Sequence, residues 1–188
     1  MPVSIGSPAQ AGFDQPLDLM KDCHRRIESF LGMLLRVSES APERPLDDAE
    51  RRALEAALKY FREAAPRHTQ DEEESLFPRL RRNTSPEVLA ALERVRQLET
   101  EHLGANALHD AVDAAGRQWL RDGRLPPETV DAVHQNLCEL RDLYRRHIHV
   151  EDSDIFPLAG KTLSSEELAA IGSEMQARRS APCASSRP

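Results

Sequence analysis

Apolar residues recur at steps of three and four along most of the chain, the spacing that puts side chains on one face of an α-helix. This pattern predicts four long helices and a short fifth one. The first runs from residue 17 to the prolines at 42 and 45, the second from 47 to 76, the third from 86 to a turn at 121–128, the fourth from that turn to about 157, and the fifth from 164 to about 179. No stretch has the alternating pattern of a β-strand.

Capping signals support three of the predicted helix starts. Asp47 with Glu50, and Ser164 with Glu167, have the spacing of a capping box, in which each side chain binds a free backbone N–H of the first turn. Ser85 precedes a proline at the first helical position, which is another common helix start. These signals fix the beginnings of the second, third and fifth helices.

Four long helices with short connections predict an all-α fold, an up-down-up-down antiparallel four-helix bundle with a short fifth C-terminal helix. Pro66 lies inside the second helix and is expected to kink it. Residues 1–16 are rich in Pro, Gly, Ser and Ala and are expected to form a flexible N-terminal arm. Residues 17–158 then form the bundle, and residues 159–188 form the short helix and a disordered tail.

Composition narrows the class of protein. The chain of 188 residues is 39% hydrophobic, 30% charged and only 4% aromatic, which suits one helical domain. Its net charge of −7 argues against nucleic acid as a partner, and no apolar run is long enough to predict a membrane span. Cys23, Cys138 and Cys183 lack the Cys-x-x-Cys spacing and are expected to be free thiols. Without a visible secretion signal, the expected location is the cytoplasm.

One short sequence motif occurs in two similar copies. Residues 68–78 read HTQDEEESLFP and residues 147–157 read HIHVEDSDIFP. In each copy a histidine is followed four residues later by a glutamate, as His68 with Glu72 and His147 with Glu151, and then by an aliphatic-Phe-Pro sequence expected to stop the helix. Two matching copies indicate a duplicated unit with a shared task.

Four histidines fall on the apolar faces, one on each long helix, and two of them carry the glutamates one turn away. These six residues are His24, His68, Glu72, His102, His147 and Glu151. Burying so many imidazoles and carboxylates without partners would cost several kcal/mol per group, on the order of the penalties known for buried polar groups. Metal ions relieve that penalty because they bind neutral imidazole and ionised carboxylate. A mutually hydrogen-bonded polar core is the alternative interpretation.

The position of these residues along the helices gives a further expectation. His24 lies early in the first helix, whereas the two His-Glu pairs lie late in the second and fourth, so an antiparallel bundle places all five in one layer. His102 lies about 24 Å from the start of the third helix at 1.5 Å per residue. Either the connection between the second and third helices protrudes beyond the site, or the third helix begins with a separate turn.

This series of residues closely resembles the hemerythrin-like (HHE) cation-binding domains, over about residues 17–158. The resemblance implies a four-helix bundle that holds two iron ions, with or without an oxygen bridge. It places His24 and His68 on one iron, His102 and His147 on the other, and Glu72 and Glu151 between the two. Mixed imidazole and carboxylate ligation suits iron or manganese, and zinc can also enter such a site.

The sequence departs from the oxygen-carrying hemerythrins at two positions. Asn106 stands where those proteins have a second histidine one turn after His102, and Glu151 follows His147 by four residues where they have Asp at five. One iron would therefore be more open, or completed by Asn106 or water. His109 is a weaker candidate ligand, because two helical turns place it about 10 Å from His102. These departures argue against reversible O2 storage.

The hypothesis favoured by these residues is a cytoplasmic non-haem di-iron protein that binds or senses a small oxidant such as O2 or nitric oxide. One alternative is a di-iron enzyme that acts on O2 or peroxide or repairs iron–sulfur clusters. Another is a structural scaffold with zinc or no metal. A protein partner is compatible with each of these hypotheses, but no segment identifies one. A ferritin-type site is disfavoured, because Glu99-x-x-His102 has no matching second copy on the fourth helix.

Overall fold

The computed structural model describes residues 11–40 and 44–180. Within those ranges all regular structure is helical and there is no strand, which confirms the predicted all-α class. The elements in chain order are α1 (Pro16–Ser40), α2 (Asp48–Glu63), α3 (Ala65–Gln70), the π-helix η1 (Asp71–Leu76), α4 (Phe77–Arg82), α5 (Pro86–Asp122), α6 (Pro127–Val150), the π-helix η2 (Glu151–Ile155), α7 (Phe156–Thr162) and α8 (Ser165–Ser180).

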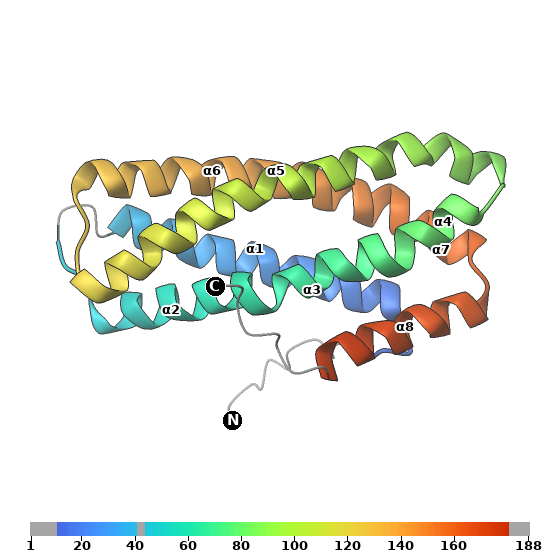
Figure 1. Cartoon of the computed structure of the whole chain (residues 1–188), viewed down its shortest axis with the longest axis horizontal. Helices are drawn as coiled ribbons and strands as arrows, with labels where there is room; N and C mark the ends of the chain where they lie inside the picture. Colours follow the sequence, from blue (N-terminus) through green and yellow to red (C-terminus); the bar gives the residue numbers. More distant parts are fainter. Residues whose placement is uncertain (1–10, 41–43, 181–188) are drawn as a thin grey trace, which may run out of the picture.

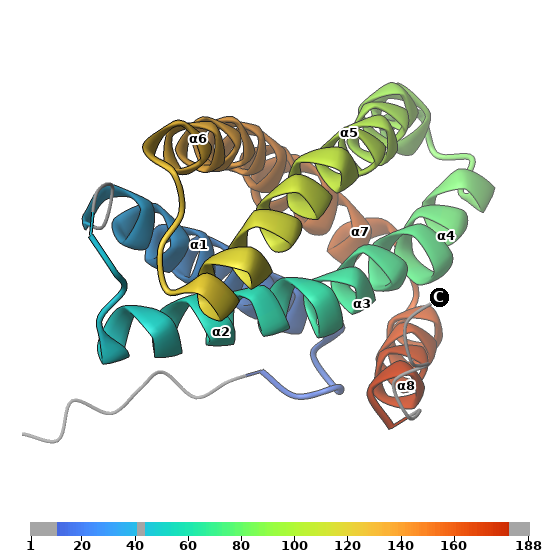
Figure 2. The same cartoon turned by 60° about the vertical axis from the view of Figure 1, so that its left-hand side comes forward.

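These elements form four long segments: α1, then α2 to α4, then α5, then α6 to α7. Consecutive segments run in opposite directions (Figures 1 and 2). α1 packs against α2 and α6, and α5 packs against the same two helices, so the four segments surround a common interior. α8 lies beside η1 and the first part of α1.

The predicted helix starts are confirmed. The Asp47 side chain accepts hydrogen bonds from the backbone N–H groups of residues 49 and 50, and the Glu50 side chain accepts one from the Asp47 N–H. Ser164 and Glu167 make the corresponding pair of bonds at the start of α8. Ser85 accepts the N–H of residue 88 at the start of α5. The sequence thus sets where these helices begin through local hydrogen bonds.

Prolines act in two different ways. The expected kink at Pro66 is confirmed, because α2 ends at Glu63 and α3 begins at Ala65. The expected helix stops at Pro78 and Pro157 are wrong, because the chain continues helically through both as α4 and α7. A proline ring clashes with the carbonyl four residues earlier and offers it no N–H. The preceding turn widens into a π-helix instead, with the N–H of the residue before each proline bonded five residues back.

The connection between α4 and α5 explains how His102 reaches the common layer. After η1 the chain continues helically for the six residues of α4 before α5 begins. α5 is a single uninterrupted helix of 37 residues. Figure 1 shows this connection at one extremity of the molecule. The connection therefore protrudes beyond the site, and the third helix has no separate first turn.

Buried apolar side chains form two clusters, one toward each end of the long segments. The first, the Trp119 cluster, includes Leu31, Leu34, Leu54, Leu58, Val112, Trp119, Leu137 and Leu140. The second, the Phe156 cluster, includes Met20, Leu76, Phe77, Leu98, Ile155, Phe156, Ile171 and Met175. Along α5, His102 lies between Leu98 of one cluster and Ala105 of the other. The predicted polar layer thus separates the two.

Residues 11–15, part of the segment expected to be a flexible arm, pack against the bundle and α8. The Ala11 N–H donates to Asp22 Oδ2 at 2.8 Å. A Cβ atom at Gly172 of α8 would lie 1.9 Å from the carbonyl oxygen of Phe13, so only glycine permits this contact. Residues 1–10, the tail 181–188 and Cys183 lie outside the described residues. Cys23 and Cys138 are free.

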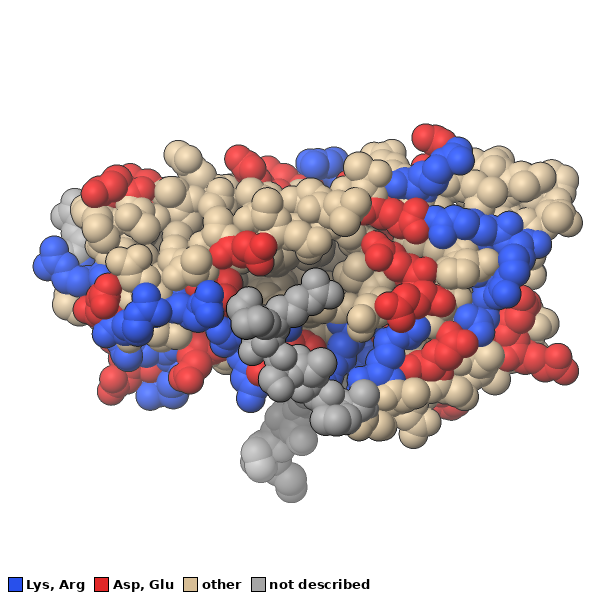
Figure 3. Space-filling view, viewed as in Figure 1, with Lys and Arg blue, Asp and Glu red and all other residues tan. Residues whose placement is uncertain are grey.

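Charged side chains of both signs are interspersed on the face shown in Figure 3. The adjacent arginines at 81–82 and 145–146 are exposed to solvent. Among the described residues, no helix combines the length and the apolar character needed to cross a membrane.

Candidate metal centre

The structure brings all six predicted side chains together. One group comprises His24, His68, Glu72 and Glu151, and a second comprises Glu72, His102, His147 and Glu151. Within each group the candidate ligand atoms lie within 4.8 Å of one another. All six residues are buried, and Glu72 and Glu151 belong to both groups. The four histidines are thus divided into the pairs His24/His68 and His102/His147.

Each shared carboxylate turns one oxygen toward each pair of histidines. Glu72 Oε1 lies 3.1 Å from His68 Nε2 and 3.8 Å from His24 Nε2, whereas its Oε2 lies 3.4 Å from His102 Nε2. Two ligand atoms about 2.1 Å from one ion are about 3.0 to 3.4 Å apart when the angle between them is a right angle or tetrahedral. The separations of 3.1 and 3.4 Å fall in that range, and the separation of 3.8 Å between Glu72 Oε1 and His24 Nε2 is somewhat longer.

Glu151 repeats the arrangement from the opposite segment. Its Oε2 lies 3.0 Å from His24 Nε2, and its Oε1 lies 3.3 Å from His147 Nε2. In both motifs the histidine precedes the glutamate by four residues, so the last α-helical turn before each π-helix places the two side chains on one face. The duplicated sequence therefore builds two halves of one centre.

Several buried polar atoms of the six side chains have no hydrogen-bond partner among residues 11–40 and 44–180. These atoms are His24 Nε2, His68 Nδ1, and both carboxylate oxygens of Glu72 and Glu151. Unpaired buried polar atoms are rare in folded proteins, since each one loses its hydration without compensation. Five of the six point among the clustered ligand atoms, and imidazole nitrogen and carboxylate oxygen are both donors to first-row metal ions. The donor set thus fits cations between the two histidine pairs.

Three of the four histidines are held by a second carboxylate on a neighbouring segment. His24 Nδ1 lies 2.9 Å from Asp152, His102 Nδ1 lies 2.9 Å from Glu73, and His147 Nδ1 lies 3.0 Å from Glu101. A carboxylate that accepts the Nδ1–H leaves Nε2 as the free lone pair, which is the state a metal needs. Within the described residues His68 has no such partner, and its Nδ1 is buried without a hydrogen bond.

Sequence reasoning missed these orienting carboxylates. A signal for two of them was present, because an acidic residue directly follows the shared glutamate in both copies of the motif, as Glu73 and Asp152. Glu73 contacts the histidine of α5, and Asp152 contacts the histidine of α1. Each copy of the motif therefore supplies one carboxylate that is shared by the two ligand groups and one that orients a histidine. The oriented histidines lie on α1 and α5, the two helices that lack the motif.

Close packing of charged groups shifts their pKa values in opposite directions. Burial and the nearby Glu151 carboxylate raise the pKa of Glu72 to about 8. Burial alone would lower the pKa of His24, but the carboxylates of Asp152, Glu151 and Glu72 raise it to about 12. Burial and the neighbouring His24 lower the pKa of His68. The centre thus favours positive charge beside its two carboxylates, and a metal cation would supply that charge.

Comparison with known proteins agrees with this geometry. The family model described as the hemerythrin HHE cation binding domain matches residues 15–159, most of the chain. The chain belongs to this family. An uncharacterized protein of Haemophilus influenzae (strain ATCC 51907 / DSM 11121 / KW20 / Rd) is 28% identical over 179 residues, which cover 94% of this chain and 98% of that protein.

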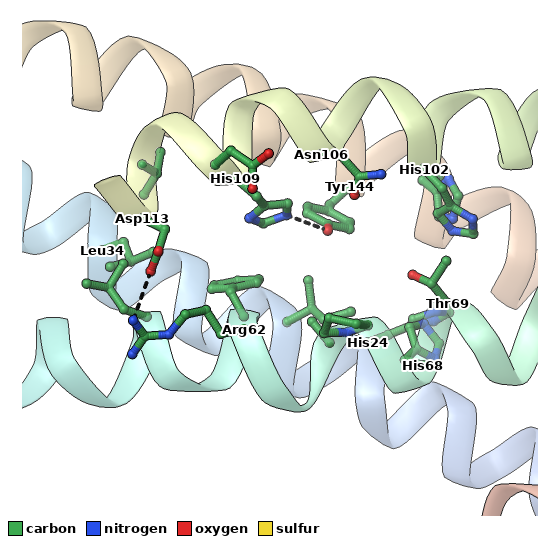
Figure 4. A pocket seen from close by; sticks show the side chains of 18 of the residues that line it. His24, Leu34, Arg62, His68, Thr69, His102, Asn106, His109, Asp113 and Tyr144 are labelled. Carbon is green, nitrogen blue, oxygen red and sulfur yellow. Dashed lines mark hydrogen bonds and ion pairs between the residues drawn. The ribbon is translucent and has the colours of Figure 1, made fainter. Parts of the chain in front are cut away.

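The two remaining candidate metal ligands, Asn106 and His109, belong to neither ligand group of this hemerythrin-like chain. His109 belongs to neither group, and its Nε2 is instead 2.8 Å from the hydroxyl of Tyr144. Asn106 is exposed at the edge of a cavity beside the centre. Figure 4 shows His109 and Tyr144 facing each other along this cavity, with His102 farther along α5.

A fully buried acidic residue ties α8 to the first motif. Asp71, directly before Glu72, accepts hydrogen bonds from Arg178 at 2.9 Å and from Arg179 at 2.6 Å. The second copy has Val150 at this position, so the contact is specific to the first copy. Sequence reasoning did not foresee it, because the partners lie more than one hundred residues away. The HHE centre is thereby packed on one side by the C-terminal helix.

Proposed function

We propose that this HHE-domain protein is a non-haem di-iron protein with an antiparallel four-helix bundle as its scaffold. In this proposal His24 and His68 bind one iron, and His102 and His147 bind the other. Glu72 and Glu151 bridge the two ions. The observation that carries the proposal is the orientation of each glutamate, which turns one oxygen toward each histidine pair.

Iron is proposed over manganese or zinc because of the family resemblance and the balance of imidazole and carboxylate donors. When bound, the two irons would supply one-electron chemistry and open positions for a small oxidant such as O2 or nitric oxide. The chain itself keeps three imidazoles oriented through Asp152, Glu73 and Glu101. It also keeps all six ligand side chains away from the protein surface. We further propose a cytoplasmic location, supported by the free thiols of Cys23 and Cys138.

Elemental analysis of protein from an iron-supplemented host tests the metal site. We expect about two irons per chain, as the two ligand groups require, and a sharp loss of iron in the Glu72→Gln/Glu151→Gln double variant. Glu74→Gln and Asp154→Asn change exposed acidic residues of the same two motifs and serve as controls that keep the iron. Metal-free wild-type protein, or a single zinc unaffected by the double substitution, would contradict the proposal.

Binding and sensing are proposed ahead of catalysis, with turnover of O2 or peroxide as the second candidate. A cavity that reaches the four imidazoles gives that second candidate its support, since it offers a route for a reactant. Anaerobic titration of the iron-loaded protein with nitric oxide, followed by absorption spectroscopy, tests binding. Catalytic loss of hydrogen peroxide that disappears in His147→Ala would favour the enzyme.

A further inference from the structure

A cavity of about 570 Å³ extends from the metal centre along the bundle interior (Figure 4). His24, His68, His102 and His147 line its inner end, and Arg62 and Asp113 lie at its other end. His102 and Asp113 are eleven positions apart on α5, which corresponds to about 16 Å at 1.5 Å per residue. The cavity is therefore long as well as large.

This volume exceeds what a diatomic ligand needs. One water molecule takes about 30 Å³ of liquid, and a diatomic molecule is of similar size. Pockets that bind organic molecules measure about 300 to 1,000 Å³. The cavity lies within that range, and the two ions would fill only its inner end.

The break between α2 and α3 leaves small side chains in the cavity wall. α2 ends at Glu63, and Ala65 and Pro66 of the next helix line the space. Larger side chains continue the wall on either side, as Phe61 and His68 do. A bulkier residue in place of Ala65 would occupy part of the cavity.

The middle of the cavity carries hydrogen-bonding groups without charge. His109 and Tyr144 are partly buried and bonded to each other at 2.8 Å. Burial lowers the pKa of His109 to about 4 and raises the pKa of the Tyr144 hydroxyl, so both side chains are neutral at pH 7. Apolar side chains, among them Ile27, Leu58 and Val112, line the wall beside them.

The outer end offers a second polar group. Arg62 of α2 lies 3.4 Å from Asp113 of α5, and this ion pair spans the cavity between the two helices. Asp113 Oδ1 is buried and has no hydrogen-bond partner. This oxygen, which faces Arg62, can accept a hydrogen bond from a hydroxyl group of a molecule inside the cavity.

We propose that the cavity binds an uncharged, mostly apolar organic molecule that carries a hydroxyl group, such as a phenol. Its apolar body packs between α2 and α5, and its hydroxyl group bonds to Tyr144 or Asp113. This inference deepens the proposed function, on which it rests, because it names the class of molecule that has access to the metal centre. Binding of the organic molecule, however, requires only side chains of the protein and no metal ion.

Calorimetric titration of the full-length protein with 2-naphthol tests this inference. We expect saturable binding at one site to both metal-free and iron-loaded protein. Naphthalene-2-sulfonate has the same rings with a negative charge in place of the hydroxyl group, and we expect it to bind at least tenfold more weakly. The sulfonate charge would have to leave water for a cavity in which the cation at one end, Arg62, is already paired with Asp113, which is the reason for this difference.

Three variants locate the site. Ala65→Leu fills the cavity and should abolish binding, whereas Ala107→Leu makes the same change on an exposed face of α5 and should leave it unchanged. Tyr144→Phe removes one hydroxyl group and should weaken binding about fivefold, the loss typical of one hydrogen bond. The iron content of each variant is measured in parallel.

The outcomes separate this inference from the proposed function. Failure of 2-naphthol to bind, equal binding of the sulfonate, or unchanged binding in Ala65→Leu would each overturn the cavity proposal. If iron binds stoichiometrically and 2-naphthol does not, the di-iron proposal stands and the cavity proposal falls. If 2-naphthol binds with the expected variant pattern and iron does not, the proposal of a di-iron centre falls alone.

Discussion

Asp152 Oδ1 lies 2.9 Å from His24 Nδ1, although the two residues are 128 positions apart in the chain. The contact joins the fourth long segment to the first. Because Glu151 also approaches His24, from the other nitrogen, two consecutive acidic residues hold both sides of one imidazole ring. The orientation of His24 is therefore set by the second motif rather than by its own helix.

Substitution of Asp152 should weaken metal binding without removing a ligand. In Asp152→Asn the His24 Nδ1–H loses its charged acceptor, and losses of about 10- to 100-fold in metal affinity are typical for such orienting groups. Competition with a coloured chelator measures the affinity. Asp154→Asn, which changes an acidic residue paired with Arg94 on the surface, should bind metal as the wild type does. Equal affinities for both variants would contradict the orienting role.

Removal of metal should lower thermal stability. A cation that binds only the folded chain stabilises it by about 4 kcal/mol when the free cation is 1,000-fold above its dissociation constant. For a chain of this size that corresponds to a shift of about 8 to 16 °C in Tm. Differential scanning calorimetry with and without chelator measures this shift. The Glu72→Gln/Glu151→Gln variant should melt at the same temperature under both conditions.

The contact between Asp71 and α8 should contribute to stability. Asp71→Asn removes the negative charge that accepts bonds from Arg178 and Arg179. We expect the free energy of unfolding to fall by about 2 kcal/mol, the range for hydrogen bonds to charged groups. Urea denaturation monitored by circular dichroism measures the change.

An exposed neighbour provides the control for this prediction. Glu74 also contacts Arg178, at 3.3 Å, but its side chain is 57% exposed. Exposed ion pairs contribute little, so Glu74→Gln should change the free energy of unfolding by about 0.5 kcal/mol or less. Similar effects of the two substitutions would mean that burial of Asp71 adds nothing to the contact.

His109 should make the stability of the fold sensitive to acid. Burial lowers its pKa in the folded protein to about 4, below its ordinary value of 6.5. Between these values the unfolded chain binds the proton more readily, so the free energy of unfolding falls as the pH decreases from 6.5 toward 4. His109 would contribute a loss on the order of 2 to 3 kcal/mol.

Denaturation of the wild type and His109→Gln at a series of pH values isolates this contribution. The variant should lose less stability than the wild type over the same interval, because glutamine has no proton to gain. His149→Gln changes an exposed histidine and should follow the wild-type profile. Parallel profiles for the wild type and His109→Gln would show that His109 is not the responsible group.

The sequence predicted the helices and the six clustered residues because both follow from local periodicity. An apolar face determines which side of a helix is buried, and His24, His68, His102 and His147 lie on such faces. The antiparallel order of the segments predicted a common depth for His24, His68 and His147. For His102, helical period and helix order were not sufficient, because its depth also depends on the protruding connection between α4 and α5.

Features that depend on contacts between segments were not predictable in this way. Glu101 orients His147 across two helices, and no local spacing identifies that pair. The π-helices before Pro78 and Pro157 were also missed, because the widened turn changes hydrogen bonding without changing the apolar pattern on either side. Proline in a helical pattern indicates a perturbed turn, but packing decides whether the helix ends or continues.

The polar layer between the Trp119 and Phe156 clusters has a consequence for cooperativity. Each cluster is apolar and contiguous within itself, and the layer of imidazoles and carboxylates interrupts apolar contact between them. Ions shared by side chains from all four segments would link the two halves of the molecule into a single folding unit. Once the ions are removed, the half around Trp119 and the half around Phe156 lose this link, and the calorimetric transition, besides moving to a lower temperature, should become broader.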